Sequence, residues 1–100
     1  MMEIAVQQVE QTEVLAWLKL KFATWLEVPA EELDPARPIS SYGLDSISAV
    51  TLSVELEEEL DMELDTAVLW DRPTLASLAE HLSEKLNAAG VASLPEAFGG

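Results

Sequence analysis

Apolar residues recur at intervals of three and four along two separate stretches, and this spacing constrains the fold more than any other feature of the sequence. It predicts one helix over about 12–27 and another over about 74–89. Each begins at a threonine suited to N-capping, Thr12 or Thr74. Trp17 falls near the edge of the first apolar face, outside its expected core. The expected buried residues are Leu15, Leu18, Phe22, Trp25 and Leu26 in the first helix and Leu75, Leu78, Ala79, Leu82 and Leu86 in the second.

The middle of the chain adds a third main helix, expected over about 46–60, and a short helix within 65–70 that Pro73 ends. Before the third helix, three prolines interrupt any regular pattern over about sixteen residues, which predicts a long loop. The apolar residues available to anchor this loop in the core are Leu33, Ile39 and Tyr42. No segment alternates as a strand does. The predicted fold is all-α, a small four-helix bundle of three main helices and one short helix, with the long loop between helices one and two.

Length and charge exclude several classes of function. A chain of 100 residues forms one small domain with a modest core. Five Lys and Arg against nineteen Asp and Glu give a formal charge of -14, which repels nucleic acids and anionic membrane surfaces and favours partners with basic surfaces. With 49% hydrophobic residues, the chain has enough apolar material to fold despite this charge.

The chain has no cysteine, so disulfides and thiol chemistry are excluded. Lone His81 has no neighbours at metal-ligand spacing, and no metal site is expected. The N-terminus lacks a basic region followed by an apolar run, and no apolar run approaches the length of a membrane span, so a cytoplasmic location is expected. Residues 1–11 are interpreted as a leader or linker, 12–89 as the functional domain, and 90–100 as a flexible tail or linker.

One hexad, Tyr42-Gly43-Leu44-Asp45-Ser46-Ile47, places a serine hydroxyl at an expected helix start. Asp45 is suited to cap the helix by accepting the backbone N–H of Ile47 or Ser48. Gly43 permits a sharp turn into the helix, which leaves Ser46 exposed. Because a helix N-terminus favours anions, a phosphodiester on Ser46 would be well placed. The residues alone favour an ordinary serine beside a helix cap, which is common in helical proteins.

The hexad resembles the Gly-x-Asp-Ser-(Leu/Ile) signature of acyl carrier proteins, and the order of expected elements over about 12–89 is similar to theirs. The resemblance implies a non-catalytic carrier whose Ser46 bears a 4′-phosphopantetheine arm that holds acyl groups as thioesters, within a motif formed by Gly43, Leu44 and Asp45. Carriers of fatty acid synthesis tend to have acidic residues where this chain has Ser48 and Thr51. This departure makes the chain more similar to polyketide synthase carriers, with peptidyl carriers of nonribosomal synthesis second. The alternative from another functional class is an acidic helical adaptor, which binds a partner protein through the helix expected over 46–60 and carries no prosthetic group.

The helix expected over 46–60 is apolar on two sides. One stripe should be core, and the other, Ile47, Val50 and Val54, is interpreted as a partner-facing patch, although Val50 and Val54 could instead pack on the short helix. Acidic residues, including Glu55, Glu57 and Glu58, crowd its C-terminal end, where the helix dipole disfavours them. Such a run is usually only a solvated face, but its position at the unfavourable end of the helix favours an electrostatic contact surface. The partners that the resemblance implies are a phosphopantetheinyl transferase, and ketosynthase, acyltransferase and other synthase domains with basic docking surfaces.

Overall fold

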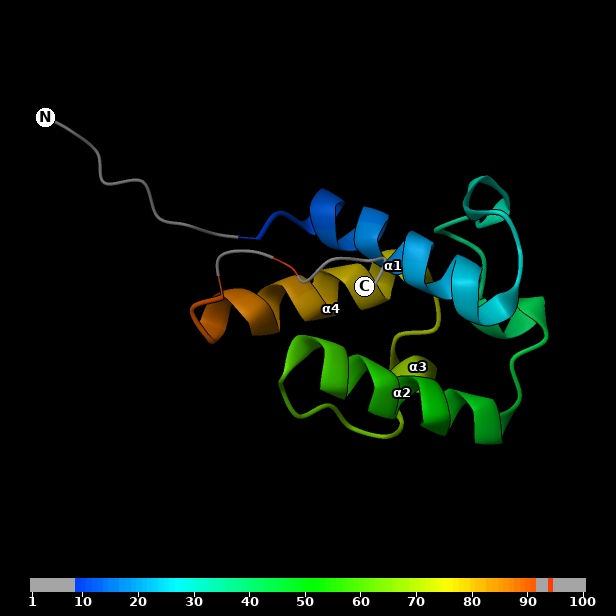
Figure 1. Ribbon diagram of the computed structural model, residues 1–100. Helices are drawn as coiled ribbons and strands as arrows, with labels where there is room; N and C mark the ends of the chain where they lie inside the picture. The colour runs from blue at the N-terminus through cyan, green and yellow to red at the C-terminus, as the bar shows by residue number, and fades with distance from the viewer. Residues whose placement is uncertain (1–8, 92–93, 95–100) are drawn as a thin grey trace, which may run out of the picture.

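The computed structural model describes residues 9–91 and 94, and this part of the chain forms a helical bundle without strands (Figure 1). Its helices are α1 (Gln11–Leu26), α2 (Ser46–Leu60), α3 (Val68–Asp71) and α4 (Leu75–Ala88). The predicted all-α bundle of three main helices and one short helix is therefore confirmed. Most of the expected leader and tail, residues 1–8, 92–93 and 95–100, lies outside the described residues.

The start of α1 differs from the prediction. Its N-cap is Glu10, and Thr12 lies exposed within the helix. The Glu10 backbone N–H donates to Glu13 Oε1 at 3.0 Å. The Glu13 side chain therefore takes part in capping the helix, a role that was expected of Thr12. The helix ends at Leu26, and its C-cap Glu27 adopts a left-handed conformation with φ 59°.

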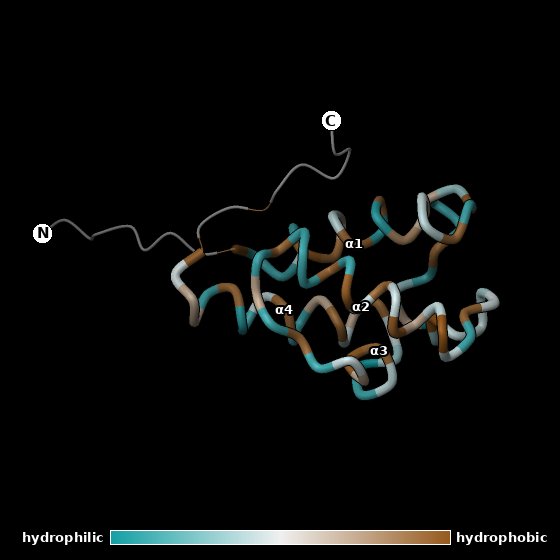
Figure 2. Tube along the Cα trace, turned by 60° about the horizontal axis from the view of Figure 1, so that its bottom comes forward, coloured by the Kyte–Doolittle hydropathy of each residue, from teal (hydrophilic) through white to brown (hydrophobic). Residues whose placement is uncertain are grey.

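Helices α1 and α4 pack side by side, and their apolar faces form much of the core (Figure 1). Hydrophobic and hydrophilic segments alternate along each helix in Figure 2, as the three-and-four spacing predicts. The assignment of the two α1 tryptophans was wrong: Trp17 is 5% exposed and belongs to the core, whereas Trp25 is only partly buried against it. Leu15 and Leu26, both expected in the core, are also only partly buried, whereas Val14 is fully buried.

A partly buried ion pair joins α1 to α2. Lys21 is 7% exposed, and its Nζ lies 3.2 Å from Glu59 Oε1. The same ammonium lies 5.7 Å from the ring centroid of Trp17 and 5.9 Å from that of Trp25. A lysine is rarely buried unless it is paired, so the carboxylate and the two rings together explain its position.

Val9 packs into the core although it lies within the segment interpreted as a leader or linker. Its backbone N–H donates to Asn87 Oδ1 at 2.7 Å, and its carbonyl accepts from Asn87 Nδ2 at 3.2 Å. These two bonds hold the chain before α1 against the last turn of α4.

The long loop between α1 and α2 is fixed to the start of α4. Leu33 and Ile39 are buried as predicted, and Tyr42 is partly buried against the core. The Ile39 N–H donates to the Pro73 carbonyl at 2.7 Å, and the Ala76 N–H donates to the Pro35 carbonyl at 3.0 Å. These bonds between distant segments position the residues that lead into α2.

Candidate functional site

A tight turn delivers Ser46 to the first position of α2. Gly43 has φ 93° and ψ 17°, a left-handed conformation that favours glycine, and an added Cβ there would meet no atom within 4 Å. The backbone conformation, rather than lack of space, therefore selects glycine. Leu44 then inserts into the core at 8% exposure, while Ser46 two residues later is exposed. The prediction that α2 begins at Ser46 is confirmed.

Asp45 caps α2 as expected. Its Oδ1 accepts the backbone N–H of Ser48 at 2.7 Å, and this bond, together with one from the Ser48 side chain, holds the pKa of the Asp45 carboxyl below its ordinary value. The cap fixes the orientation of the first turn, and with it the direction in which Ser46 leaves the helix. The fifteen-residue helix aligns its dipole toward this end, where an attached anion is stabilised.

The two apolar stripes of α2 separate as the sequence predicts. The core stripe of Ala49, Leu52, Leu56 and Leu60 is buried. Ile47 is 78% exposed, Val50 43% and Val54 39%, so the second stripe faces mainly outward. Trp70 on α3 is also 43% exposed, an apolar surface residue that the sequence did not single out.

The acidic residues of α2 do not all have the same role. Glu55 and Glu58 are exposed. Glu57 is partly buried, and its Oε2 accepts the backbone N–H of Leu64 at 2.7 Å, which ties the segment after α2 to the helix. Glu59 forms the ion pair with Lys21. Among these four, Glu55 and Glu58 are the residues whose carboxylates the described fold does not engage.

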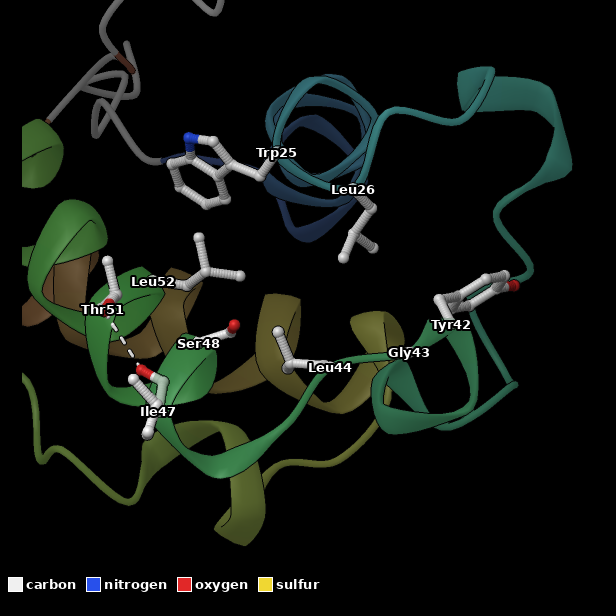
Figure 3. Close-up of a pocket in the computed structure, with 9 residues that line it drawn as sticks. All are labelled: Trp25, Leu26, Tyr42, Gly43, Leu44, Ile47, Ser48, Thr51 and Leu52. Atoms are coloured by element: carbon white, nitrogen blue, oxygen red, sulfur yellow. Dashed lines mark hydrogen bonds between the residues drawn. The ribbon is translucent and has the colours of Figure 1, made fainter.

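A pocket of about 370 Å³ opens beside the turn, between the end of α1, the loop and the first turns of α2 (Figure 3). Figure 3 shows Trp25, Leu26, Leu44 and Leu52 around it, with the Ser48 hydroxyl directed toward the space between them. The nine lining residues are Trp25, Leu26, Tyr42, Gly43, Leu44, Ile47, Ser48, Thr51 and Leu52.

Sequence reasoning missed this pocket. Ser48 and Thr51 were noted only as departures from an acidic pattern, and Trp25 was assigned to the core. Ser48 and Thr51 are uncharged although they belong to a helix that is acidic toward its C-terminal end. This contrast is the sequence signal that could have indicated the pocket. Ser46 itself does not line the pocket, although Ile47 beside it does.

His81 is partly buried on α4, and burial lowers the pKa of its imidazole below the ordinary value, helped by Arg72 and Lys85. Within residues 9–91 and 94, no group of three or more His, Cys, Asp or Glu side chains is arranged to hold a metal ion. In the same part of the chain, no helix combines the length and apolarity needed to cross a membrane.

Comparison with known proteins gives consistent matches. A family model described as "Phosphopantetheine attachment site" matches residues 16–82. Polyketide synthase PksL of Bacillus subtilis is 31% identical over 86 residues, which cover 84% of this chain and 2% of that protein. The HMG-ACPI domain of the CurA module from Lyngbya majuscula is 27% identical, with a TM-score of 0.78 and coverage of 91% of this chain and 92% of that one. A free-standing peptidyl carrier protein from Acinetobacter baumannii is 38% identical, with a TM-score of 0.70 and coverage of 77% and 96%.

Proposed function

This chain belongs to the phosphopantetheine attachment-site family, and from that premise we propose that it carries acyl intermediates of polyketide synthesis on an arm attached to Ser46. The family's cofactor is 4′-phosphopantetheine, bound covalently, and its thiol holds the acyl group as a thioester. Carrier domains of this family are not catalysts, so the bond-forming chemistry belongs to partner domains. The observation that carries the proposal is the exposed Ser46 at the first position of α2, inside the matched range and within the proposed domain limits of 12–89.

The residues around Ser46 fit this group. The hydroxyl lies at the positive end of a long helix, which favours the phosphodiester, and Gly43 and Leu44 hold it at an exposed corner that a modifying enzyme can reach. Asp45 keeps the first turn of the helix in place through its bond to the Ser48 N–H. Each motif residue therefore has a role in presenting the serine.

The attachment is tested by intact-protein mass after incubation with coenzyme A and a broad-specificity phosphopantetheinyl transferase. We expect wild type to gain the mass of one phosphopantetheine and Ser46→Ala to gain none. Ser48→Ala is the matched control, because it removes another exposed serine hydroxyl from the same helical turn, and it should still be modified. Modification of Ser46→Ala would place the attachment at another residue. No mass gain by folded wild type, beside a control carrier that is modified, would favour the unmodified adaptor.

The docking surface is proposed to combine the patch of Ile47, Val50 and Val54 with the exposed carboxylates of Glu55 and Glu58. The patch lies on the helix that Ser46 begins, so a partner that reaches the arm contacts it. The carboxylates steer basic surfaces of the transferase, ketosynthase and acyltransferase toward this helix and raise the rate of encounter more than the final affinity. Glu57 contributes less, because one of its oxygens is already bonded to the Leu64 N–H.

Charge reversal tests this surface. Glu58→Lys should lower kcat/KM of the transferase several-fold at low salt, and the loss should shrink as ionic strength rises. Glu31→Lys is the matched control, because it makes the same charge change at an exposed residue in the turn Ala30–Glu32. Equal losses for both variants would indicate that net charge, rather than the α2 surface, controls the encounter.

The polyketide assignment is supported by the similarity to the Bacillus subtilis synthase, of which the chain spans 2% of the length. The similarity to a peptidyl carrier protein keeps nonribosomal peptide synthesis as the alternative pathway. Acylation of the modified protein by acyltransferase domains, compared with aminoacylation by adenylation domains, separates the two. Preferential aminoacylation would contradict the polyketide assignment.

A further inference from the structure

The chain contains a single tyrosine, and its hydroxyl joins two parts of the loop between α1 and α2. Tyr42 Oη accepts the backbone N–H of Asp34 at 2.8 Å and donates to the carbonyl of Glu32 at 3.4 Å, which is the longer and weaker bond. A phenol hydroxyl donates and accepts at the same time, so the two bonds are compatible. The residue that precedes Gly43 is thus fixed to backbone groups eight and ten residues earlier.

The ring of Tyr42 is held as well. The guanidinium carbon of Arg37 lies 4.5 Å from the centroid of the Tyr42 ring, within the range of a cation–π interaction. Arg37 Nε donates to Ser41 Oγ at 2.7 Å, and Ser41 Oγ donates to the Pro38 carbonyl at 2.6 Å, so the guanidinium is itself fixed over the ring. One side chain therefore gathers three parts of the loop, residues 32–34, 37–38 and 41–42.

These contacts restrict the loop locally rather than stabilise the whole fold. Glu32, Asp34 and Arg37 are all exposed, so water replaces the lost partner of each when the Tyr42 hydroxyl is removed. Exposed pairs of this kind contribute little to the free energy of unfolding. Their effect is to limit the conformations that the segment before Gly43 adopts.

Gly43 is the joint between this cluster and α2 (Figure 3). After the joint, Leu44 is buried in the core and Asp45 caps the helix, so both are held in place. Before the joint, Ile39 is buried, and Tyr42 fixes the short stretch that remains between Ile39 and the glycine. Because glycine restricts its own backbone little, the orientation of the loop relative to α2 depends on the residues that hold its two sides.

An enzyme that modifies Ser46 covers this cluster as well as the helix. Consecutive Cα atoms are about 3.8 Å apart, so Tyr42 lies within about 15 Å of Ser46. A protein–protein interface of standard size buries about 800 Å² on each partner, which is a patch about 30 Å across. A patch centred on Ser46 therefore extends to Tyr42 and the loop around it.

We propose, on the basis of the attachment at Ser46 proposed above, that Tyr42 is a positioning residue for this modification. In the reaction, the Ser46 oxygen forms a bond to the pantetheine-bearing phosphorus of coenzyme A and loses its proton to a base. The pyrophosphate bond breaks, and the nucleotide leaves with the electron pair. Tyr42 takes no part in these bond changes: its hydroxyl holds the loop and the turn in the arrangement that the transferase recognises.

This role predicts which kinetic constant changes. Without the hydroxyl, the segment before Gly43 samples other arrangements, and the transferase binds only the fraction of molecules in which the segment is correctly placed. The apparent affinity falls by that fraction, whereas the chemical step within the bound complex is unaffected. Loss of the Tyr42 hydroxyl therefore raises KM and leaves kcat near its wild-type value.

Steady-state kinetics of a broad-specificity phosphopantetheinyl transferase, with this protein as the varied substrate, test the proposal. We expect Tyr42→Phe to raise KM about threefold to tenfold, with kcat within about twofold of wild type. Ser41→Ala frees the Arg37 guanidinium from the ring without a change of charge, and it should raise KM in the same direction.

Two control variants should leave KM within about twofold of wild type. Thr24→Val is matched in chemistry, because it removes an exposed hydroxyl that donates to a backbone carbonyl at 3.1 Å, but within α1. Val14→Ala is matched in stability, because it leaves a cavity in the core near the start of α1 and lowers the free energy of unfolding without altering the loop cluster.

Solvent exchange of backbone amides, measured by NMR, reports on the cluster without the transferase. In Tyr42→Phe the Asp34 amide should exchange faster, whereas the Ser48 amide, which is bonded to Asp45, should exchange as in wild type. An unchanged KM in folded Tyr42→Phe, a loss confined to kcat, or an equal rise of KM in Val14→Ala would overturn the positioning role while the attachment stands. Wild type that gains no arm would refute the attachment at Ser46, and this role with it, whatever the Asp34 amide shows.

Discussion

The ion pair between Lys21 and Glu59 allows a stability prediction to be worked from the structure. The side chain of Lys21 is 8% exposed and that of Glu59 is 34% exposed, with 3.2 Å between Nζ and Oε1. Glu59→Gln removes the negative charge with little change in shape and leaves the Lys21 ammonium buried beside the rings of Trp17 and Trp25. Lys21→Met instead replaces the ammonium with a thioether that suits an aromatic site.

Glu59→Gln and Lys21→Met should lower the free energy of unfolding by different amounts. At an effective dielectric constant near 20, the gross attraction at this distance is about 5 kcal/mol, and desolvation of the ammonium offsets most of it. Removing one partner costs about 3–5 kcal/mol in fully buried pairs and about 0–1 kcal/mol in exposed ones. Because water reaches Glu59, we expect Glu59→Gln to destabilise the fold by about 2 kcal/mol. Lys21→Met should cost less than about 1 kcal/mol, since no buried charge is left behind.

Urea unfolding followed by far-UV circular dichroism measures both changes. With an m value of about 1 kcal/mol/M, Glu59→Gln should lower the midpoint by about 2 M, and in the Lys21→Met background it should have almost no effect. Glu31→Gln, at an exposed turn residue, is the matched control and should stay within about 0.5 kcal/mol of wild type. A larger loss for Lys21→Met than for Glu59→Gln, or the same loss for Glu59→Gln in both backgrounds, would refute the reasoning.

Three further predictions concern single residues near the site and on α4. Gly43→Ala should destabilise the fold by about 1 kcal/mol in urea unfolding, because alanine is strained at φ 93° although there is space for its Cβ; an unchanged midpoint would show that the turn relaxes. The pKa of Asp45 is lowered in the folded state, so its carboxylate stabilises the fold at pH values above the ordinary pKa of 3.8, and this contribution is lost as pH falls through the lower folded pKa. The stability difference between wild type and Asp45→Ala should therefore shrink between pH 7 and pH 2, and a constant difference would contradict the cap assignment. Burial lowers the pKa of His81, so an NMR titration of its ring protons should show a midpoint below 6.5, and a midpoint above that value would place the imidazole in a more solvated or more acidic setting.

The start of α2 could be predicted from the sequence because several local signals coincide there. Gly43 marks the turn and Asp45 the cap, and the structure places both as expected. The burial of Leu44 between them was not predicted. Local signals also located α4, since Thr74 caps it and its apolar face is narrow. The separation of the two stripes of α2 followed from the same periodicity, because the bundle has room to bury only one of them.

The orientation of α1 could not be predicted in the same way. Its apolar residues lie around much of the helix, so a rotation that buries Trp17 and one that buries Trp25 fit the spacing almost equally well. The observed orientation places Lys21 beside Glu59, thirty-eight residues later in the chain, in an ion pair between distant segments. Contacts between distant segments also shape the pocket, which is closed by α1 on one side and by α2 on the other. Periodicity within one helix contains no information on such contacts.

The backbone bonds between the loop and the start of α4 set an order of events during synthesis. Ile39 and Pro35 are bonded to Pro73 and Ala76, so the segment before Ser46 acquires its fixed position only after residues some forty positions later have left the ribosome. A nascent chain that ends within α2 contains the whole hexad but lacks the anchor that holds its turn. An enzyme that recognises the folded turn would therefore encounter its substrate only once the domain has been synthesised through the start of α4, and the proposed modification of Ser46 would report that the domain has folded.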